Sequence, residues 1–585
     1  MSLPKRWQIA PPALTAHLRA YTGMSPTLAQ ILYNRGFTDP AEARLFLHAS
    51  DPAAGRFLAL STRPNTPIVR AVGRIRQAVA RKEKIAVYGD FDADGVTSTA
   101  LMVLALREIG ALVEPYIPHR VDEGYGLNGE ALRRLAASGT KLVVTVDCGI
   151  RSVVEVEEGI AAGLDIIITD HHTPGADVPP AYAVINPKLT DFPYSEPMLA
   201  GVGVAFRLAE ALLTVQRANA RNGYQPRLSV DDLFDLVAIG TVADLAPLNR
   251  VENRALVRRG LDQLRRAPRL GVIKLLKCAS LKPEDVDSDR IGYVIGPRIN
   301  AAGRLASAQT ALRLLLADDE AEAAELAQEL QTLNARRQEL TLQAQEVVRA
   351  QLKLDAANLE AFELPPLIFA SDRSFQPGIV GLVAGRLTEE YFRPSIVLEE
   401  GEHESRASCR SIPEFDITHA LDLCAELLVR HGGHAQAAGF TVVNDNIPIL
   451  RQRLTDLARQ ALQDRPLQPV LEIDAEIDIH QITLDLAREL SALEPTGHGN
   501  PKPILAARGV RVLDWRPVGR EGQHLKLRLA RAGMPPLDAI GFNMIDATAH
   551  IGAQIDAAFY VEINEWNGAQ SPQLRLIDVR PALSS

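Results

Sequence analysis

Residues 85–95 read Ile-Ala-Val-Tyr-Gly-Asp-Phe-Asp-Ala-Asp-Gly, a short apolar run followed by aspartates at positions 90, 92 and 94. The apolar run predicts a strand buried on both faces, and residues 95–109 carry the apolar spacing of a helix. Carboxylates at alternating positions behind a strand can point at one place, where their mutual repulsion calls for a hard cation. Capping of the following helix is the alternative explanation, with Asp94 at its N-terminus, but a cap needs one aspartate rather than three.

Two further apolar runs end in groups of the same kind. Residues 142–146 precede Asp147, and residues 166–169 precede Asp170-His171-His172. Because ligands bind beyond the carboxyl ends of parallel strands, we expect these side chains to gather at one edge of a sheet. Asp244, at a predicted helix-to-loop transition, could join them. Mixed Asp and His ligation favours Mn²⁺ or Mg²⁺, and two such ions roughly 3.5–4 Å apart would clamp a displacement at phosphorus.

Length and composition exclude several classes of protein. A chain of 585 residues has room for three or four domains. Its 46% hydrophobic and 23% charged residues exclude a disordered or fibrous protein. We find no membrane-length apolar run, no signal core and no CxxC spacing among the four cysteines, so we expect a cytoplasmic location and no membrane partner. The net charge of −9 confines any nucleic-acid binding to local basic patches.

The alternation of predicted elements divides the chain into five regions. They are an N-terminal helical segment, a doubly wound parallel-sheet α/β domain, a helical connector with a long helix at about 318–353, a second α/β domain, and a β-rich tail of the OB kind. Their predicted bounds are 1–65, 66–250, 251–360, 361–462 and 463–585. In the tail, residues 524–529 alternate as a half-buried strand does.

These motifs resemble those of the DHH phosphoesterase superfamily, through Asp-x-Asp-x-Asp-Gly, the aspartate behind the next strand, and Asp-His-His. Residues 432–439, Gly-Gly-His-Ala-Gln-Ala-Ala-Gly, resemble the glycine-rich signature of the DHH-associated second domain. Four more stretches are similar, in sequence and order, to the RecJ family of single-strand-specific 5′→3′ exonucleases. They are Arg-Val-Asp-Glu-Gly-Tyr-Gly-Leu-Asn (120–128), Gly-Pro-Arg-Ile-Asn-Ala-Ala-Gly-Arg (296–304), Gly-Ile-Val-Gly (378–381) and Ser-Cys-Arg-Ser (408–411).

The resemblance implies a role for each matching position. The implied metal ligands are Asp92, Asp94, Asp147, His171 and Asp244, with Asp90 as a further acid and His172 beside the scissile phosphate. The implied holders of a terminal 5′-phosphate are Arg304, Ser408 and Arg410. The remaining implied substrate contacts are Arg120, Tyr125, Asn128, Arg298, Asn300, Gly433 and His434. One position departs from the pattern: residue 409 is Cys, where we expect the family to prefer Gly.

Three groups outside the aspartate cluster keep two interpretations each when the family is set aside. Gly432-Gly433 before His434 predicts either a backbone that wraps an anion or a tight turn with a packed histidine. Arg410 between two serines predicts a phosphate site or a surface ion pair. Residues 501–533 carry eight basic side chains against two acids, with Trp515 among them. That pattern predicts a single-strand groove, or a solvated sheet face with the tryptophan in the core.

We therefore predict a metal-dependent exonuclease that degrades single-stranded DNA from the 5′ end to mononucleotides, in DNA repair and recombination. A single-strand-binding protein and a helicase are candidate partners. A short-oligonucleotide or cyclic-dinucleotide phosphodiesterase, or a pyrophosphatase, would not need residues 466–585. A non-catalytic replication scaffold would tolerate loss of the acids, all of which are present. A nucleotide-binding regulatory module would want a phosphate loop, and no GxxxxGK[ST] occurs.

Overall fold

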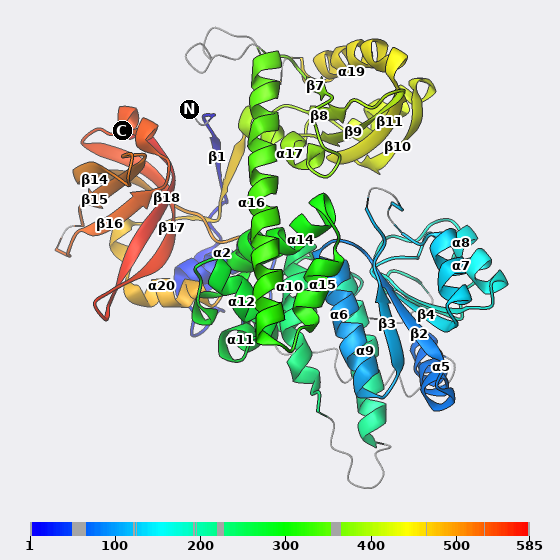
Figure 1. Cartoon of the computed structure of the whole chain (residues 1–585). Helices are drawn as coiled ribbons and strands as arrows, with labels where there is room; N and C mark the ends of the chain where they lie inside the picture. The colour runs from blue at the N-terminus through cyan, green and yellow to red at the C-terminus, as the bar shows by residue number, and fades with distance from the viewer. Residues whose placement is uncertain are drawn as a thin grey trace.

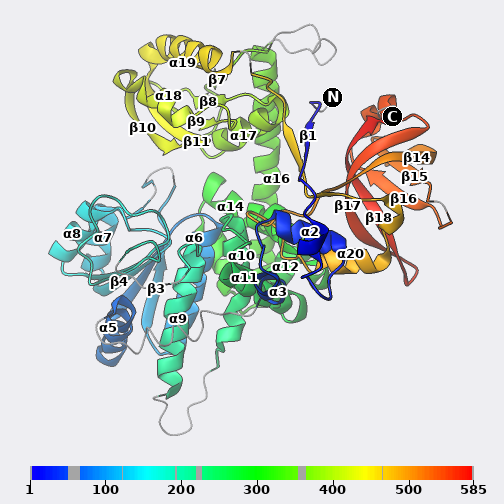
Figure 2. The same ribbon diagram turned by 180° about the vertical axis from the view of Figure 1, so that it is seen from behind.

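The structure is a computed structural model, and it describes residues 3–49, 66–120, 123–124, 126–190, 194, 196–218, 227–352, 364–463, 465–531 and 533–582. The long helix α16 (Glu320–Gln351) stands at the centre of the molecule. Both α/β domains lie on one side of it, one above the other, and the C-terminal β domain lies on the other side (Figures 1 and 2). The helix predicted at about 318–353 is thereby confirmed.

The first α/β domain is built on a parallel sheet of five strands in the order β3-β2-β4-β5-β6. Its strands are β2 (Lys84–Gly89), β3 (Leu112–Tyr116), β4 (Thr140–Val146), β5 (Asp165–Thr169) and β6 (Ala183–Ile185). One face carries α5 (Pro67–Arg81), α6 (Ala93–Glu108) and α9 (Gly201–Ala218), and the other carries α7 (Gly129–Ala137) and α8 (Val153–Ala161). The predicted doubly wound sheet is confirmed, and its strand order reverses between β2 and β4.

Strand β2 shows why the sequence forms this sheet. Ile85 and Val87 pack in the core shared with α5, α6 and α9, whereas Ala86 and Tyr88 pack in the core shared with α7 and α8. All four side chains are fully buried. Burial of each large apolar side chain contributes about 1.5–3 kcal/mol, so the strand is fixed from both faces. The loop that follows it therefore leaves the sheet at a fixed point.

A helical body continues from this domain and shares its core, which runs from Ile68 to Leu330. Its main helices are α10 (Phe234–Ala243), α11 (Val251–Arg266), α12 (Leu270–Cys278), α14 (Gly296–Leu305) and α15 (Gln309–Leu316), with the short α13 (Ser288–Arg290) between them. Helix α16 leaves this body and runs toward the second α/β domain. Because one core serves the sheet and these helices, the aspartates at the sheet edge and the arginines of α14, Arg298 and Arg304, belong to one structural unit.

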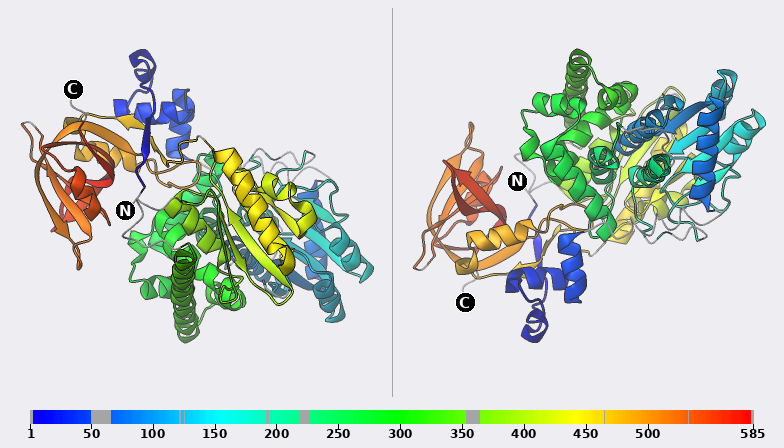
Figure 3. Two further views of the ribbon diagram at one scale, coloured as in Figure 1. Left: turned by 90° about the horizontal axis from the view of Figure 1, so that it is seen from above. Right: turned by 90° about the horizontal axis from the view of Figure 1, so that it is seen from below.

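The second α/β domain has a mixed five-stranded sheet in the order β10-β11-β9-β8-β7, and only the β7–β8 pair is parallel. Its strands are β7 (Ile368–Asp372), β8 (Ser395–Glu399), β9 (Glu404–Arg410), β10 (Leu428–His434) and β11 (Ala437–Val443). Its helices are α17 (Val380–Tyr391), α18 (Ile417–Asp422) and α19 (Ile447–Leu462). Helix α19, yellow in Figure 3, lies along one face of this sheet.

The C-terminal domain is a closed barrel, because β14 pairs with β15 on one side and with β17 on the other. Its strands are β14 (Leu505–Val518), β15 (His524–Leu529), β16 (Leu537–Gly541), β17 (Gln554–Trp566) and β18 (Ala569–Pro581), preceded by β12 (Val470–Ile473), β13 (Ala475–Glu476) and α20 (Leu484–Ser491). The β-rich tail and the strand predicted at 524–529 are confirmed.

The N-terminal segment packs on this barrel rather than on the domain that follows it in sequence. Helices α2 (Pro26–Asn34) and α3 (Pro40–His48) contribute to the barrel's core, and the short α1 (Thr15–Leu18) lies against it. Strand β1 (Arg6–Ile9) pairs in parallel with β12. The sequence predicted helical pieces here and gave no sign of β1, because four residues carry too little pattern to identify a strand.

Candidate active site

The aspartate loop connects the end of β2 to the start of α6. Asp92 is the N-cap of α6, and its Oδ1 accepts hydrogen bonds of 3.0 Å from the backbone amides of Asp94 and Gly95. The capping explanation therefore accounts for one oxygen of Asp92, and the cap is not Asp94. A side chain at Gly95 would place its Cβ 2.5 Å from the backbone oxygen of Asp90, so only glycine permits this tight approach.

Asp94 points at the N-terminus of α9. Its Oδ2 accepts a hydrogen bond of 2.7 Å from the amide of Gly201, and its Oδ1 accepts one of 2.9 Å from the amide of Val202. The free amides at a helix N-terminus favour such a carboxylate. A Cβ on Gly201 would lie 2.4 Å from Oδ1 of Asp147, so the helix end is pressed against two of the predicted ligands.

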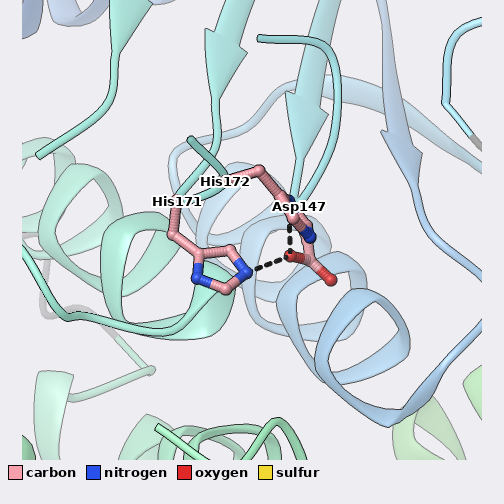
Figure 4. Close-up of side chains that lie close together, drawn as sticks. All are labelled: Asp147, His171 and His172. Atoms are coloured by element: carbon pink, nitrogen blue, oxygen red, sulfur yellow. Dashed lines mark ion pairs between the residues drawn. The ribbon is translucent and has the colours of Figure 1, made fainter. Parts of the chain in front are cut away.

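His171 lies close to three of the acids, and Figure 4 shows it beside Asp147 and His172. Its Nε2 is 3.1 Å from Oδ1 of Asp147, 3.7 Å from Oδ2 of Asp244 and 4.0 Å from Oδ2 of Asp94. Asp147 follows β4 with φ +63°, a strained conformation for a non-glycine residue. Asp244 is the C-cap that follows α10, at the helix-to-loop transition that the sequence predicted.

All seven residues of the predicted catalytic set come together. Three groups have ligand atoms within 4.8 Å of one another: Asp147 with His171 and His172, Asp94 with His171 and Asp244, and Asp90 with Asp92 and Asp147. The groups share Asp147 and His171. Three linked sets of this kind offer ligands for two neighbouring ions.

The electrostatics of the cluster fit a divalent cation. Burial, followed by repulsion from neighbouring carboxylates, raises the pKa of Asp94 to about 7, of Asp90 to about 8 and of Asp244 to about 9. Burial and the adjacent His172 lower the pKa of His171 to about 3, so its imidazole is neutral, the form that binds metals. Buried atoms without hydrogen-bond partners include Asp90 Oδ1, Asp147 Oδ1 and His171 Nε2. Buried polar atoms are almost always satisfied, so these three are suited to a bound ion.

Asp170 positions the histidines, a role that the sequence did not assign. Its Oδ1 accepts from the backbone amides of His171 and His172 at 2.7 and 3.0 Å and lies 2.8 Å from Nδ1 of His172. Burial alone would raise the pKa of Asp170, but these bonds hold it below its usual value. The His172 side chain stays 40% exposed, although its Nδ1 lies 2.8 Å from the buried Asp170 and 4.0 Å from the buried Asp147.

A group of arginines, Arg304, Arg337, Arg410 and Arg120, lies beyond the aspartates. Arg304, at the end of α14, donates from Nη1 to the backbone oxygen of Gly378 at 3.0 Å. Burial, and then the charges of Arg120, Arg337 and Arg410, lower the pKa of Arg304 to about 10. No ion pair with an acid is found for Arg304, Arg337 or Arg410 within the described part of the chain. Such a cluster attracts an anion, and Arg337 of α16 is a member that no motif indicated.

Ser408 and Arg410 lie on β9, where the Arg410 Nη1 donates to Ser408 Oγ at 3.2 Å. A Cβ on Gly381 would come within 3.0 Å of Ser408 Oγ and 3.4 Å of Arg410 Nη2. Cys409 is completely buried in the core of the second domain, on the opposite face of the strand. The departure from glycine at position 409 therefore places no side chain beside the arginine.

The other predicted substrate contacts take different places. Asn300 accepts from the amide of Ala93 at 2.8 Å and so ties α14 to the aspartate loop. Arg120 stacks 4.6 Å over the ring of Phe91 in the same loop. Asn128 is the N-cap of α7, and Arg298 donates to Gln331 and to the backbone of Val294. Tyr125 lies outside the described residues.

The Gly-Gly-His stretch forms part of a strand. Residues 432–434 continue strand β10 and pair with β11, so they do not form a tight turn. That Gly433 and His434 contact the substrate stays a prediction. Gly433 has φ +150°, and a Cβ there would lie 2.4 Å from the backbone oxygen of Ala437. Glycine is required by close strand pairing. His434 is exposed at the strand's end.

None of the eight basic side chains of residues 501–533 is buried, and Trp515 is exposed as well. Trp515 is 44% exposed on the outer half of β14, so the alternative that it fills the core is wrong. Lys502, Arg508 and Lys526 form ion pairs with acids. The other five of the predicted eight basic residues have no acidic partner among the described residues: Arg511, Arg516, Arg520, Arg528 and Arg531, of which Arg531 donates to the backbone oxygens of Ile482 and Pro535.

Within the described residues, no helix is both long enough and apolar enough to cross a membrane.

Three family models match the chain in order. The DHH family N-terminal domain matches residues 84–241, the DHHA1 domain residues 365–464, and the RecJ OB domain residues 473–578. The doubly wound fold with its Asp and His edge is thus that of a DHH-family protein.

Within the DHH family, the chain is similar over most of its length to several exonucleases of one kind. The single-stranded-DNA-specific exonuclease RecJ of Bacillus subtilis is 37% identical over 98% of this chain and 70% of its own length. That of Dickeya dadantii is 37% identical over 88% and 90%. Crystal structures of Thermus thermophilus RecJ with Mn²⁺ and with Mg²⁺ match 99% of the chain, with TM-scores of 0.81 and 0.76, identities of 32% and 29%, and 80% and 79% of their own chains covered. The chain belongs to the RecJ family.

Proposed function

We propose that the protein is a metal-dependent exonuclease that removes mononucleotides from the 5′ end of single-stranded DNA, in repair and recombination. The observation that carries the proposal is the set of three ligand groups at the sheet edge, which are linked to one another through Asp147 and His171. The match of residues 473–578 to the RecJ OB domain supports a polymeric substrate over a dinucleotide or pyrophosphate.

In this proposal Asp90, Asp92, Asp94, Asp147, Asp244 and His171 hold two divalent ions, Mn²⁺ or Mg²⁺. When bound, such ions lower the pKa of a water molecule and stabilise the oxygens of an in-line displacement at phosphorus. The exposed His172 side chain, held by Asp170, donates to the scissile phosphate. No side chain is required as a nucleophile.

Direction comes from the arginine cluster. A metal site recognises any phosphodiester, so a second site must fix the strand's end at a set distance from it. Arg304 and the Ser408/Arg410 pair bind the terminal 5′-phosphate, whose charge exceeds that of an internal diester. Arg120, Arg298 and Arg337 extend the positive field, and Trp515 with the unpaired arginines of the barrel binds the strand farther along.

The single strand is the proposed partner of the barrel surface. A single-strand-binding protein, a helicase and a cytoplasmic location remain predictions. The test of the function is to incubate the protein and Mn²⁺ with single- and double-stranded DNA labelled at the 5′ or the 3′ end. We expect mononucleotides released first from the 5′ end of single strands. Equal cutting of duplexes, or first release from the 3′ end, would contradict the proposal.

A further inference from the structure

The first part of the segment between α20 and β14, residues 492–500, is a joint that connects the barrel to the helical body and is held by Arg254 of α11. The Arg254 side chain is fully buried. All five of its N–H groups donate to backbone carbonyl oxygens, those of Phe46, Ala492, Leu493, Glu494 and Pro495, at 2.8–3.1 Å. This uses the entire donor capacity of a guanidinium group. The joint is therefore fixed to α11.

The same joint packs against the loop that follows Asp244. The amide of Leu248 donates to the backbone oxygen of His498 at 2.7 Å. A Cβ on Gly499 would lie 2.8 Å from Oδ1 of Asn249 and 3.1 Å from Cβ of Pro247. Two segments packed this closely cannot move independently, because interiors resist deformation. A shift of the joint is therefore passed to residues only three to five positions from Asp244.

Asn253, next to Arg254 on α11, holds a second part of the metal site. Its Nδ2 donates to the backbone oxygens of Pro247 at 3.2 Å and Met198 at 2.7 Å. Met198 leads into the N-terminus of α9, where the amide of Gly201 binds Asp94. Neighbouring residues on one helical turn thus hold the barrel joint and both segments that position the aspartates.

We propose that this contact couples the barrel to the metal centre. A single strand held on the barrel favours the joint position in which the 245–250 loop places Asp244 among the ligands, so strands long enough to reach the barrel raise the affinity for the metal. Arg254 and Asn253 are positioning residues in this device. The inference rests on the proposed function. Linkage requires that the metal strengthens strand binding by the same factor.

The experiment compares two glycines of equal backbone strain. Gly499 has φ +72° and is enclosed by the 247–249 loop, whereas Gly533 has φ +71° and nothing within 4 Å of its Cβ position. Gly499→Ala therefore presses on the loop, and Gly533→Ala introduces the strain alone. The probe is Mn²⁺, whose binding is measured by electron paramagnetic resonance with and without a long circular single strand, which has no end to be cut.

We expect the circle to raise the Mn²⁺ affinity of the parent and of Gly533→Ala by roughly 5- to 150-fold. Gly499→Ala should lose most of that increase, although it stays folded, with a melting transition as cooperative as that of Gly533→Ala, and keeps the parent's affinity for the circle in chelator. The coupling would be overturned if the circle left the Mn²⁺ affinity of the parent unchanged. It would also be overturned if the circle raised the Mn²⁺ affinity of Gly499→Ala as much as that of the parent.

A measurement on the unmodified protein covers the case in which Gly499→Ala folds poorly. Binding of the circle in chelator should slow amide exchange of residues 245–250, and unchanged exchange there would also overturn the coupling. These readouts record binding, not hydrolysis. A protein that shows the coupling but releases no nucleotide from linear strands would disprove the proposed function and leave this inference standing.

Discussion

Two regions of the molecule bury charged side chains. The metal edge consists of the Asp and His side chains at the carboxyl ends of β2, β4 and β5, and the barrel joint consists of residues 492–500 together with Arg254. The two regions differ in whether the buried polar atoms have hydrogen-bond partners. At the edge, Asp147 Oδ1 and His171 Nε2 are buried and have no hydrogen-bond partner among the described residues. At the joint, every N–H of Arg254 is satisfied by a carbonyl. A satisfied buried charge stabilises the fold around it, whereas an unsatisfied one costs stability unless a ligand completes it. The comparison separates a group that serves architecture from one that serves binding.

The largest expected effect is a loss of hydrolysis when an aspartate of the metal edge is changed. Asp147→Asn should reduce hydrolysis by more than the roughly 100-fold that loss of an outer partner costs. Because the change removes one of several repelling charges, the melting temperature in chelator should stay or rise. Asp177→Asn, an exposed loop residue, is the control. Near-normal turnover of Asp147→Asn at saturating Mn²⁺ would mean that the edge is not the metal site.

At the joint we expect the opposite effect on stability, namely a large loss. Arg254→Met leaves five carbonyl groups without donors and should cost about 3–5 kcal/mol of stability. Melting with and without Mn²⁺ measures it. Arg508→Met breaks an exposed ion pair with Glu476 and should cost less than about 1 kcal/mol. If the two variants melt alike, the contrast between the regions is lost.

The raised pKa values of the aspartates at the metal edge predict that the stability of the metal-free protein depends on pH. Burial and neighbouring carboxylates raise the pKa of Asp94 to about 7 and of Asp90 to about 8, against about 4 in an unfolded chain. The metal-free folded protein then holds protons that the unfolded chain has lost, so its stability falls as pH rises from about 4 to about 8. Melting curves in chelator should show this decline, and Mn²⁺ or Asp147→Asn should flatten it. A melting temperature in chelator that climbs across this range would refute the account.

The arginine cluster predicts a substrate-dependent loss. Arg410→Ala should cost about 1.5–3 kcal/mol on 5′-phosphorylated single strands, which is roughly 10- to 150-fold, and little on 5′-hydroxyl strands. Arg406→Ala, on the same strand β9, is the control. A variant at position 410 that keeps the parent's preference for the phosphorylated end would show that another group recognises it.

The smallest effect is expected on the barrel. Trp515→Ala should weaken binding of a long single strand by about 1–3 kcal/mol for one stacked base. Leu513→Ala removes an equally exposed apolar side chain from the same strand and should change little. Each added loss of an unpaired arginine should reduce the salt slope by about 0.7. Deletion of the barrel is a poorer test, because it would uncover the core of the N-terminal helices.

The strands that the sequence predicted and those it missed differ in burial. Strands β2, β4 and β5 are buried on both faces and read as continuous apolar runs. Strand β3 is only half-buried at the sheet edge and contains Glu114 and Pro115, so its sequence shows no such run. The sequence also could not show that Gly433 serves close strand pairing, because glycine permits both turns and strands.

The sequence by itself determined the type of chemistry. Three acids behind one strand, one behind a second and a histidine pair behind a third can meet only at the carboxyl edge of a parallel sheet, and local periodicity is enough to find those strands. Only the tertiary structure decided which oxygen of Asp92 caps a helix, that Asp170 positions His172, that Arg337 joins the arginines, and that Arg254 fixes the barrel. These depend on contacts between residues far apart in the chain. A guanidinium on a helix gives no local sign of the five carbonyl groups, brought from two distant segments, that fold around it.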